Sequence, residues 1–151
     1  MQENFYSGET YVCGESVASF IKHAMHAFHR TVDAKVADMD LTSMQWAPLL
    51  LLASGKASTA AELSRCNNVD TSTMTRMLDR LENKGLVTRK RNSNDRRVFD
   101  IELTEEGRRL AEKIPQLIAD SLNQHLRGFT REEFETLSSL LKRFTAGEKP
   151  E

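Results

Sequence analysis

The chain has 151 residues, of which 39% are hydrophobic and 28% are charged, and its 21 Lys and Arg residues against 22 Asp and Glu residues give a net charge of −1. This length suits one domain with a substantial core, and the hydrophobic fraction is too high for a disordered chain. The near-neutral total charge argues at first against a nucleic-acid-binding protein, because such proteins are usually basic.

The expected compartment follows from the cysteines and from the absence of apolar segments. Cys13 and Cys66 are too few for a disulfide framework, and the first residues show no basic and then apolar pattern of a secretory signal. The longest apolar run, Trp46 to Ala53, is far shorter than the ~20 residues of a membrane helix. We therefore expect a cytoplasmic protein with reduced thiols and no membrane association.

Two helices are predicted in the first third of the chain. Apolar residues recur at helical spacing over residues 16–38: Val17, Phe20, Ile21, Ala24, Phe28 and Val32. Thr42 and Gln45 fit a capping box that opens the second helix. Pro48 lies past the first turn of that helix, where it predicts a kink or a late start.

The next two helices are predicted to form a helix-turn-helix. Thr59 and Glu62 fit a second capping box, and this third helix should end near Cys66. Asp70 is a suitable N-cap for a fourth helix that ends before Gly85. The expected core face of the fourth helix consists of Met74, Leu78 and Leu81. A connection of about four residues between two helices is typical of this motif.

Two short strands and two more helices complete the predicted fold. The strands contain Leu86, Val87, Val98, Ile101 and Leu103, with a basic, turn-rich loop over residues 89–97 between them. Thr104 starts a helix whose apolar stripe is interrupted at Pro115, and Thr130 with Glu133 opens the last helix. The fold class is therefore mainly α with a small β-wing, a winged helix-turn-helix between helical ends.

The distribution of charge reverses the first impression. Residues 76–97 contain eight basic and three acidic residues, a local charge of +5, which leaves −6 for the rest of the chain. A basic helix and loop beside a helix-turn-helix indicate contact with double-stranded DNA. A merely solvated basic loop is the alternative, and the preceding helix-turn-helix argues against it.

Candidate DNA-binding residues lie on the fourth helix and in the loop: Ser72, Thr73, Thr75, Arg76, Arg80, Arg89, Asp95, Arg96 and Arg97. Arg76 suits a bidentate pair with guanine, and Arg80, nearer the helix end, suits a phosphate. Arg97 suits a minor groove, with Asp95 holding it by an ion pair. Alternatively, Arg76 pairs with Asp79 or Glu82 on its own helix, and Asp95 only forms a turn.

The ordered set of residues 61–63, 69–87, 95–97 and 103–107, the last reading Leu-Thr-Glu-Glu-Gly, resembles the MarR family of bacterial transcription regulators. The motifs cover about residues 41–118. Carried over by position, Thr75, Arg76 and Arg80 match groove-facing residues of the family, and Asp95 and Arg97 match its wing.

The resemblance also implies how the chain assembles and acts. It implies a single MarR-like domain over residues 1–151, with a DNA-binding lobe at residues 42–104 and dimerisation helices at residues 11–38 and 105–145. The expected protein is a homodimeric repressor, released from a pseudo-palindromic operator by a small molecule. The apolar stripes of the terminal helices are consistent with a dimer. They are too long to be covered by a single small domain, so a second copy of the chain is expected to bury them.

The effector expected from the resemblance is a small phenolic or heteroaromatic carboxylic acid, bound between the lobe and the dimer region. Candidate contacts there are Phe28, His29, Met44 and Trp46, with Arg30 or Arg65 as the cation for the carboxylate. An ordinary core role is the alternative for these apolar side chains.

Other switches and other functional classes remain as alternatives. Cys13 is a candidate redox sensor, and the repeat His23, His26 and His29 is a weak candidate for zinc. A winged-helix module that binds a protein is the alternative to a DNA-binding regulator, and a response of binding to salt distinguishes them. No phosphate loop or catalytic triad pattern is present, so we expect no catalytic residue and no cofactor.

Overall fold

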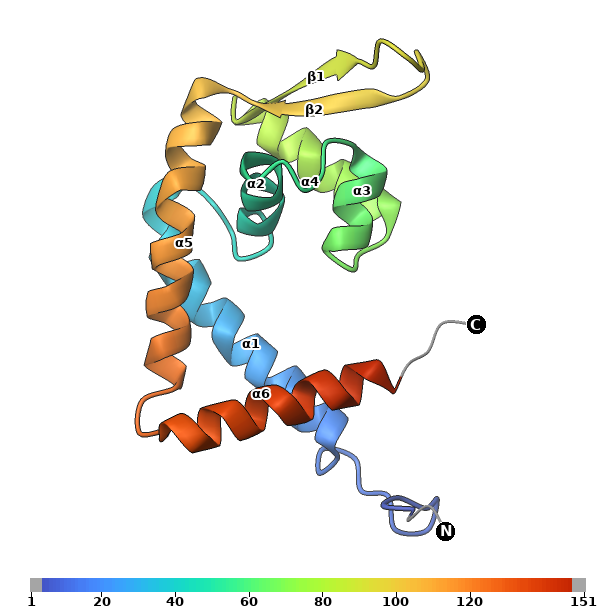
Figure 1. Cartoon of the computed structure of the whole chain (residues 1–151), viewed down its shortest axis with the longest axis vertical. Helices are drawn as coiled ribbons and strands as arrows, with labels where there is room; N and C mark the ends of the chain where they lie inside the picture. The colour runs from blue at the N-terminus through green and yellow to red at the C-terminus, as the bar shows by residue number, and fades with distance from the viewer. Residues whose placement is uncertain (1–3, 148–151) are drawn as a thin grey trace.

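The computed structural model describes residues 4–147, which form helices and one two-stranded sheet (Figure 1). In chain order the elements are α1 (Val17–Val36), η1 (Ala37–Met39), α2 (Trp46–Ala53), α3 (Ala60–Cys66), α4 (Thr71–Asn83), β1 (Val87–Arg91), β2 (Phe99–Leu103), α5 (Glu105–His125) and α6 (Arg131–Ala146). The fold is mostly helical with an antiparallel wing, as the sequence predicts.

The first two helices begin where local hydrogen bonding favours them. The hydroxyl of Ser16 caps α1 by accepting from the backbone N–H of Ser19. α2 begins at Trp46 and not at Thr42, because residues 43–45 form a turn in which Gln45 accepts from the N–H of Thr42. Pro48 then falls in the first turn of α2, where no intrahelical donor is needed. The late start predicted from Pro48 is confirmed.

The helix-turn-helix forms with the predicted caps. Thr59 and Glu62 form a reciprocal capping box at the start of α3. Asp70 caps α4 by accepting from the N–H of Thr73. Gly85 follows α4 with a φ of +70°, a left-handed conformation that glycine adopts without strain. The chain can therefore turn sharply from α4 into β1.

The wing is longer than the sequence predicts. β1 and β2 pair antiparallel from Val87 opposite Leu103 to Arg91 opposite Phe99. Residues 89–91 therefore belong to a strand, and the prediction of a loop starting at Arg89 is wrong. The basic composition of residues 89–91 is typical of a loop, but their pairing with β2 holds them in a strand.

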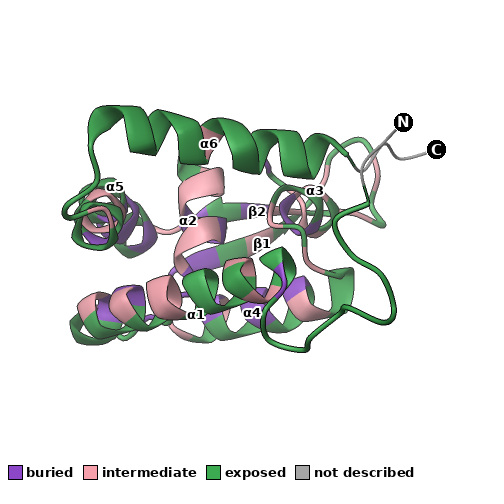
Figure 2. Cartoon of the chain, turned by 90° about the horizontal axis from the view of Figure 1, so that it is seen from below, coloured by how far each residue is buried: buried purple, intermediate pink, exposed green. Residues whose placement is uncertain are grey.

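α5 runs without interruption from Glu105 to His125, so Pro115 does not break it. Pro115 is exposed, whereas its neighbour Ile114 and the earlier Leu110 are buried. Proline lacks a backbone N–H and so removes one helical hydrogen bond, and the packing of these buried neighbours compensates for that loss. α6 contains no buried residue, and nearly all of it carries the exposed colour in Figure 2.

The core lies inside the lobe formed by α2, α3, α4, the sheet and the first half of α5, and it extends to Val32 and Val36 at the end of α1. Its largest fully buried side chains include Leu49, Leu63, Met74, Leu78, Leu81 and Ile114. The core therefore fixes α4 against the wing, while α6 lies outside it, across from the lobe (Figure 1). Among the helices within residues 4–147, none is both long enough and apolar enough to cross a bilayer.

Candidate nucleic-acid interface

α4 presents a polar face to solvent because its apolar residues all point into the lobe. Met74, Met77, Leu78 and Leu81 are buried. The opposite side of the helix carries exposed polar residues, namely Ser72, Thr75, Arg76, Asp79, Arg80 and Asn83. This face has the composition of a helix that reads a DNA groove.

The hydroxyl groups of α4 differ in their surroundings. Thr73 is half-buried, and its hydroxyl donates to a carboxylate oxygen of Asp70 at 2.6 Å. Thr75 is exposed, and its hydroxyl donates to the carbonyl oxygen of Thr71 at 2.8 Å. Ser72 is exposed at the first turn of the helix. Ser72 is therefore the best placed of the three to donate to a phosphate oxygen, whereas Thr75 is exposed but would have to give up its bond to Thr71 in order to donate.

Arg76 and Arg80 are exposed, and neither makes an ion pair with any residue in the described range 4–147. Together with Met44 and Met77 they line a shallow hollow of about 200 Å³ beside α4. Asp79, which the sequence offered as a partner for Arg76, pairs with Arg89 instead. The two arginines thus keep their hydrogen-bond donors available for a ligand on this face.

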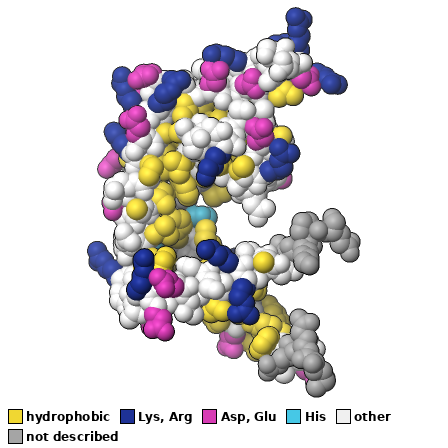
Figure 3. Space-filling view, viewed as in Figure 1, with side chains coloured by type: hydrophobic (Ala, Val, Ile, Leu, Met, Phe, Trp, Pro, Cys, Tyr) yellow, Lys and Arg dark blue, Asp and Glu magenta, His cyan; other side chains and the backbone are white. Residues whose placement is uncertain are grey.

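The wing loop is ordered by its own hydrogen bonds. The side-chain oxygen of Asn92 accepts from the N–H groups of Asn94 and Asp95. Asp95 accepts from the backbone N–H of Arg97 at 3.0 Å and from its Nε at 3.3 Å, so the predicted ion pair is present. Arg97 remains 92% exposed. Arg96 is exposed too, and basic side chains mark the tip of the wing in Figure 3.

Besides Arg97, three more basic residues within residues 76–97 make ion pairs within the chain. Arg89 pairs with Asp79 at 2.6 Å and with Glu82 at 2.9 Å. Lys90 pairs across the wing with Glu102 at 2.5 Å. Lys84 binds the carbonyl and the carboxylate of Asp40 and the side chain of Gln45 at the connection between α1 and α2. The side chain of Arg89, predicted as a DNA contact, is therefore already occupied by two carboxylates on α4.

Two carboxylates of the helix-turn-helix have a lowered pKa because they cap helices. Hydrogen bonds from the hydroxyl and the backbone N–H of Thr73 hold the pKa of Asp70 below its usual range. The N–H and hydroxyl of Ser58, together with the N–H of Thr59, lower the pKa of Glu62 in the same way. Both carboxylates are consequently ionised near neutral pH, where each favours the N-terminus of its helix.

The four residues predicted to contact an effector lie in different surroundings. Phe28 and His29 are half-buried on α1, and the Phe28 ring lies edge-on to His125 of α5. Met44 is 45% exposed and faces the hollow beside α4. Trp46 packs against the core, and its indole nitrogen is buried without a hydrogen-bond acceptor among residues 4–147.

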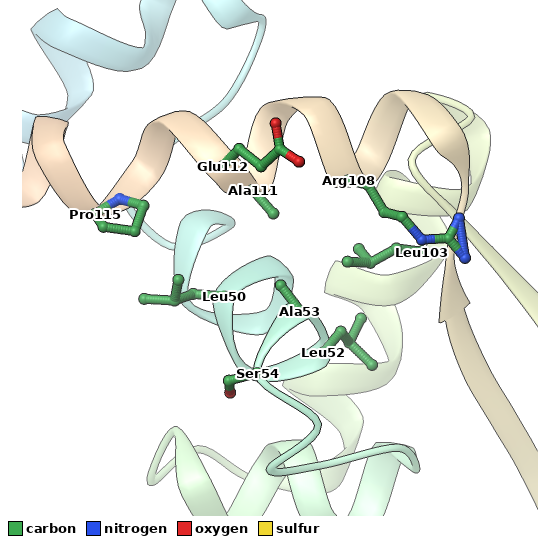
Figure 4. A pocket seen from close by; sticks show the side chains of 9 residues that line it. All are labelled: Leu50, Leu52, Ala53, Ser54, Leu103, Arg108, Ala111, Glu112 and Pro115. Carbon is green, nitrogen blue, oxygen red and sulfur yellow. The ribbon is translucent and has the colours of Figure 1, made fainter.

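A larger hollow of about 470 Å³ lies between α2 and α5. Figure 4 shows Leu50, Leu52 and Ala53 of α2 facing the first half of α5, which contributes Arg108 and Glu112 to the opposite side of the hollow. None of the four predicted effector contacts lines this hollow. Arg30, predicted as a cation for the carboxylate, lines another depression with Lys35 and His125, and Arg65 lies in the last turn of α3.

The residues of the alternative switches are exposed or dispersed. Cys13 is exposed in a turn ahead of α1. His23 and His26 are exposed, whereas His29 is half-buried. In the part of the chain that the structure describes, no three His, Cys, Asp or Glu side chains are grouped as metal ligands.

A short helix, a solvent-facing second helix and a basic antiparallel wing define a winged helix-turn-helix, the class of protein to which this lobe belongs. The profile of the MarR family matches residues 41–99. The multiple antibiotic resistance protein MarR of Escherichia coli strain K12 is 36% identical over 115 residues, which cover 76% of this chain and 80% of that protein. The chain belongs to the MarR family and is a transcriptional regulator of that family.

Solved structures agree with this assignment. A cysteine-to-serine mutant of E. coli MarR complexed with operator DNA superposes with a TM-score of 0.79 at 31% identity, over 89% of this chain and 99% of that one. The S. aureus MepR–DNA complex gives a TM-score of 0.81 at 21% identity, over 88% of this chain and 98% of that one. The second likeness concerns the fold alone.

Proposed function

We propose that this regulator is a homodimeric repressor that binds a pseudo-palindromic operator and is released by a small aromatic acid. The observation that carries the DNA-binding geometry is the surface of α4. Its arginines Arg76 and Arg80 face solvent without ion pairs in the described range, and Arg97 extends from the wing beside a supporting carboxylate. Guanidinium groups clustered on the outward face of a helix and on the adjacent wing favour phosphate and base contacts.

Each DNA-contacting residue has a proposed role on this surface. Arg76 lies in the middle of the outward face, where it suits a bidentate pair with guanine in the major groove. Ser72, Thr75 and Arg80 lie around it and suit phosphates or base edges. Arg97, held by Asp95, enters the adjacent minor groove, where negative potential attracts a guanidinium.

Arg96 and Thr73 complete the proposed set in supporting positions. Arg96 is exposed next to Arg97 and adds positive charge at the tip of the wing. Thr73 orients the carboxylate that caps α4 and therefore contributes to the position of the helix N-terminus.

A second copy of the chain is the proposed cover for the terminal helices, residues 11–38 and 105–145. Apolar side chains on these elements are extensively exposed: Val17, Phe20, Leu122, Phe129, Phe134, Leu137, Leu140, Leu141 and Phe144. A symmetric dimer buries such faces against one another. Two-fold symmetry then spaces the two α4 helices about 34 Å apart, one turn of the duplex.

The proposed effector is a phenolic or heteroaromatic carboxylic acid that contacts Trp46. The buried indole N–H of Trp46 has no acceptor within residues 4–147, and a carboxylate or phenolic oxygen would satisfy it. Phe28, His29 and Met44 remain proposed apolar contacts, although they do not line one hollow together. Titration with 4-hydroxybenzoate and nicotinate should quench the single tryptophan, and unchanged fluorescence with both contradicts the assignment.

The DNA-binding proposal is tested by selection of bound duplexes from a random pool, followed by footprinting. We expect an inverted repeat with half-sites centred about 10–10.5 base pairs apart. A reporter gene placed behind the selected sequence should be expressed less when the protein is present. A selected site without two-fold symmetry contradicts the dimer geometry, and increased expression contradicts repression.

A further inference from the structure

Arg89 joins the wing to α4, the recognition helix of the proposed DNA-binding surface. It stands on β1, opposite Ile101 of β2, and its guanidinium reaches back to two carboxylates on α4. One terminal nitrogen donates to Asp79 at 2.6 Å and the other donates to Glu82 at 2.9 Å. The side chain is only 26% exposed, so it is the most sheltered member of this cluster. Within residues 4–147 these two pairs are the only ion pairs between α4 and the sheet.

One of the two carboxylates lies on the face of α4 that meets DNA. Asp79 is three residues after Arg76 and four after Thr75, so the three side chains share one side of the helix. The Asp79 side chain is 50% exposed and the Glu82 side chain is 39% exposed. A carboxylate on this face repels phosphate unless a cation balances its charge.

Arg89 and Lys84 hold α4 to different parts of the molecule. Lys84, at the C-cap of α4, binds the connection between α1 and α2 through Asp40 and Gln45. Arg89 instead fixes the outward side of α4 to the strand that leads directly into the wing loop. The Arg89 pairs therefore help to set the position of the wing tip relative to α4, whereas the contacts of Lys84 do not involve the wing.

We propose that Arg89 is a positioning residue for DNA recognition: it cancels the charge of Asp79 and Glu82 on the recognition helix and sets the wing relative to that helix, rather than contacting DNA. This inference rests on DNA binding through α4 and the wing. The proposal also gives Asp79 and Glu82 a role: they hold the guanidinium of Arg89, which would otherwise be free to bind a phosphate.

A double-mutant cycle on duplex binding tests the role of Arg89. The four proteins are the unmodified chain, Arg89→Gln, Asp79→Asn with Glu82→Gln, and the triple variant, each titrated with the same fluorescent duplex at fixed salt. We expect Arg89→Gln to weaken binding about tenfold, and neutralisation of the acids to restore most of that loss in the triple variant. In the presence of Arg89, neutralisation of the acids loosens the wing from α4 but also removes two negative charges from the face proposed to meet DNA. These effects oppose each other, so the affinity should change by less than about threefold.

A direct contact between Arg89 and DNA predicts a different result. Neutralisation of the acids would then raise the affinity by the same factor with and without Arg89, and this additivity overturns the proposal. If Arg89→Gln does not fold, Arg89→Lys replaces it in the cycle, because lysine keeps the charge but lacks the fork that binds two carboxylates at once. Its initial loss should be smaller; restoration of that loss by neutralising the acids supports the same role, and additivity again overturns it.

The cycle separates this inference from the proposed function. If the unmodified chain does not bind duplex DNA, the proposed function fails. If the unmodified chain binds and the cycle is additive, only the role of Arg89 fails. Circular dichroism and the sedimentation coefficient of each variant control for losses of fold or of assembly.

Discussion

The exposed apolar face of α6 should lose its proposed role in dimerisation when two of its leucines are shortened. Leu137 and Leu141 lie one helical turn apart, and they are 39% and 41% exposed in the single chain. Complete burial of an exposed leucine contributes about 1.5–3 kcal/mol, so each exposed fraction corresponds to about 0.6–1.2 kcal/mol. A symmetric dimer contains each leucine twice, and the substitutions Leu137→Ala and Leu141→Ala together should cost about 2.4–4.8 kcal/mol of association free energy.

This loss should raise the dimer dissociation constant by about 50- to 3,000-fold, which sedimentation equilibrium over a range of concentrations measures directly. The matched control is Ser139→Ala with Lys142→Ala, which changes the opposite side of the same helix and should leave the dissociation constant within about threefold. A double-leucine variant that associates as tightly as the unmodified chain refutes the assignment of this face, and a monomeric unmodified chain refutes the dimer itself.

Three further outcomes follow from the structure. Gly107→Ala should destabilise the fold by about 3 kcal/mol in urea unfolding, because its Cβ would lie 2.0 Å from the backbone oxygen of Leu86, whereas Gly8→Ala, with open space around it, should stay within about 0.5 kcal/mol of the unmodified chain. Asp70→Ala should lower the melting temperature at pH 7, because the folded state lowers the pKa of this carboxylate. Its contribution to stability is therefore present above the unfolded pKa, about 3.9, and is lost as the pH falls through the lower folded pKa. Equal differences in melting temperature at pH 7 and pH 2 would contradict the cap. Arg97→Ala should weaken operator binding at moderate salt with fold and assembly unchanged, and an unchanged affinity in anisotropy titrations would show that the wing does not enter the groove.

The elements of the fold were predictable wherever a short stretch of chain contains its own signal. The capping boxes at Thr59 and Thr130 and the N-cap at Asp70 each satisfy backbone groups within three residues, and all three are present. Gly85 likewise ends the α4 segment through its own conformational freedom. Such signals depend mainly on the local chain. The capping box predicted at Thr42 is the exception, because α2 begins only at Trp46.

The errors arose where distant contacts decide the structure. The segment from Arg89 to Arg91 has the composition of a loop, but pairing with residues 99–101 makes it a strand. The partners of Arg89 lie seven and ten residues earlier, on another element, and no periodicity relates them.

The candidate site divides in the same way. The outward arginines of α4 follow from helical periodicity once the core face is known, and Asp95 with Arg97 is a local pair. The proposed effector contacts come from α1, from the turn before α2 and from α2 itself, whose relative placement the sequence does not specify. Phe28 lies against α5 and Met44 faces α4, so a common pocket for them could not be predicted from residue types alone.

The central claim is that α4 and the wing bind DNA through their cations, and the salt dependence of duplex binding tests it most directly. Fluorescence anisotropy of a duplex containing the selected operator, measured at several salt concentrations, gives the slope of the logarithm of affinity against the logarithm of salt. With about three to five phosphate contacts per protomer in a dimer, we expect a slope between about −5 and −9. The same measurement on Arg80→Ala should give a slope less steep by about 2, one phosphate contact in each half-site. A slope near zero for the unmodified chain would contradict the account, because a surface that releases no counterions does not neutralise phosphates.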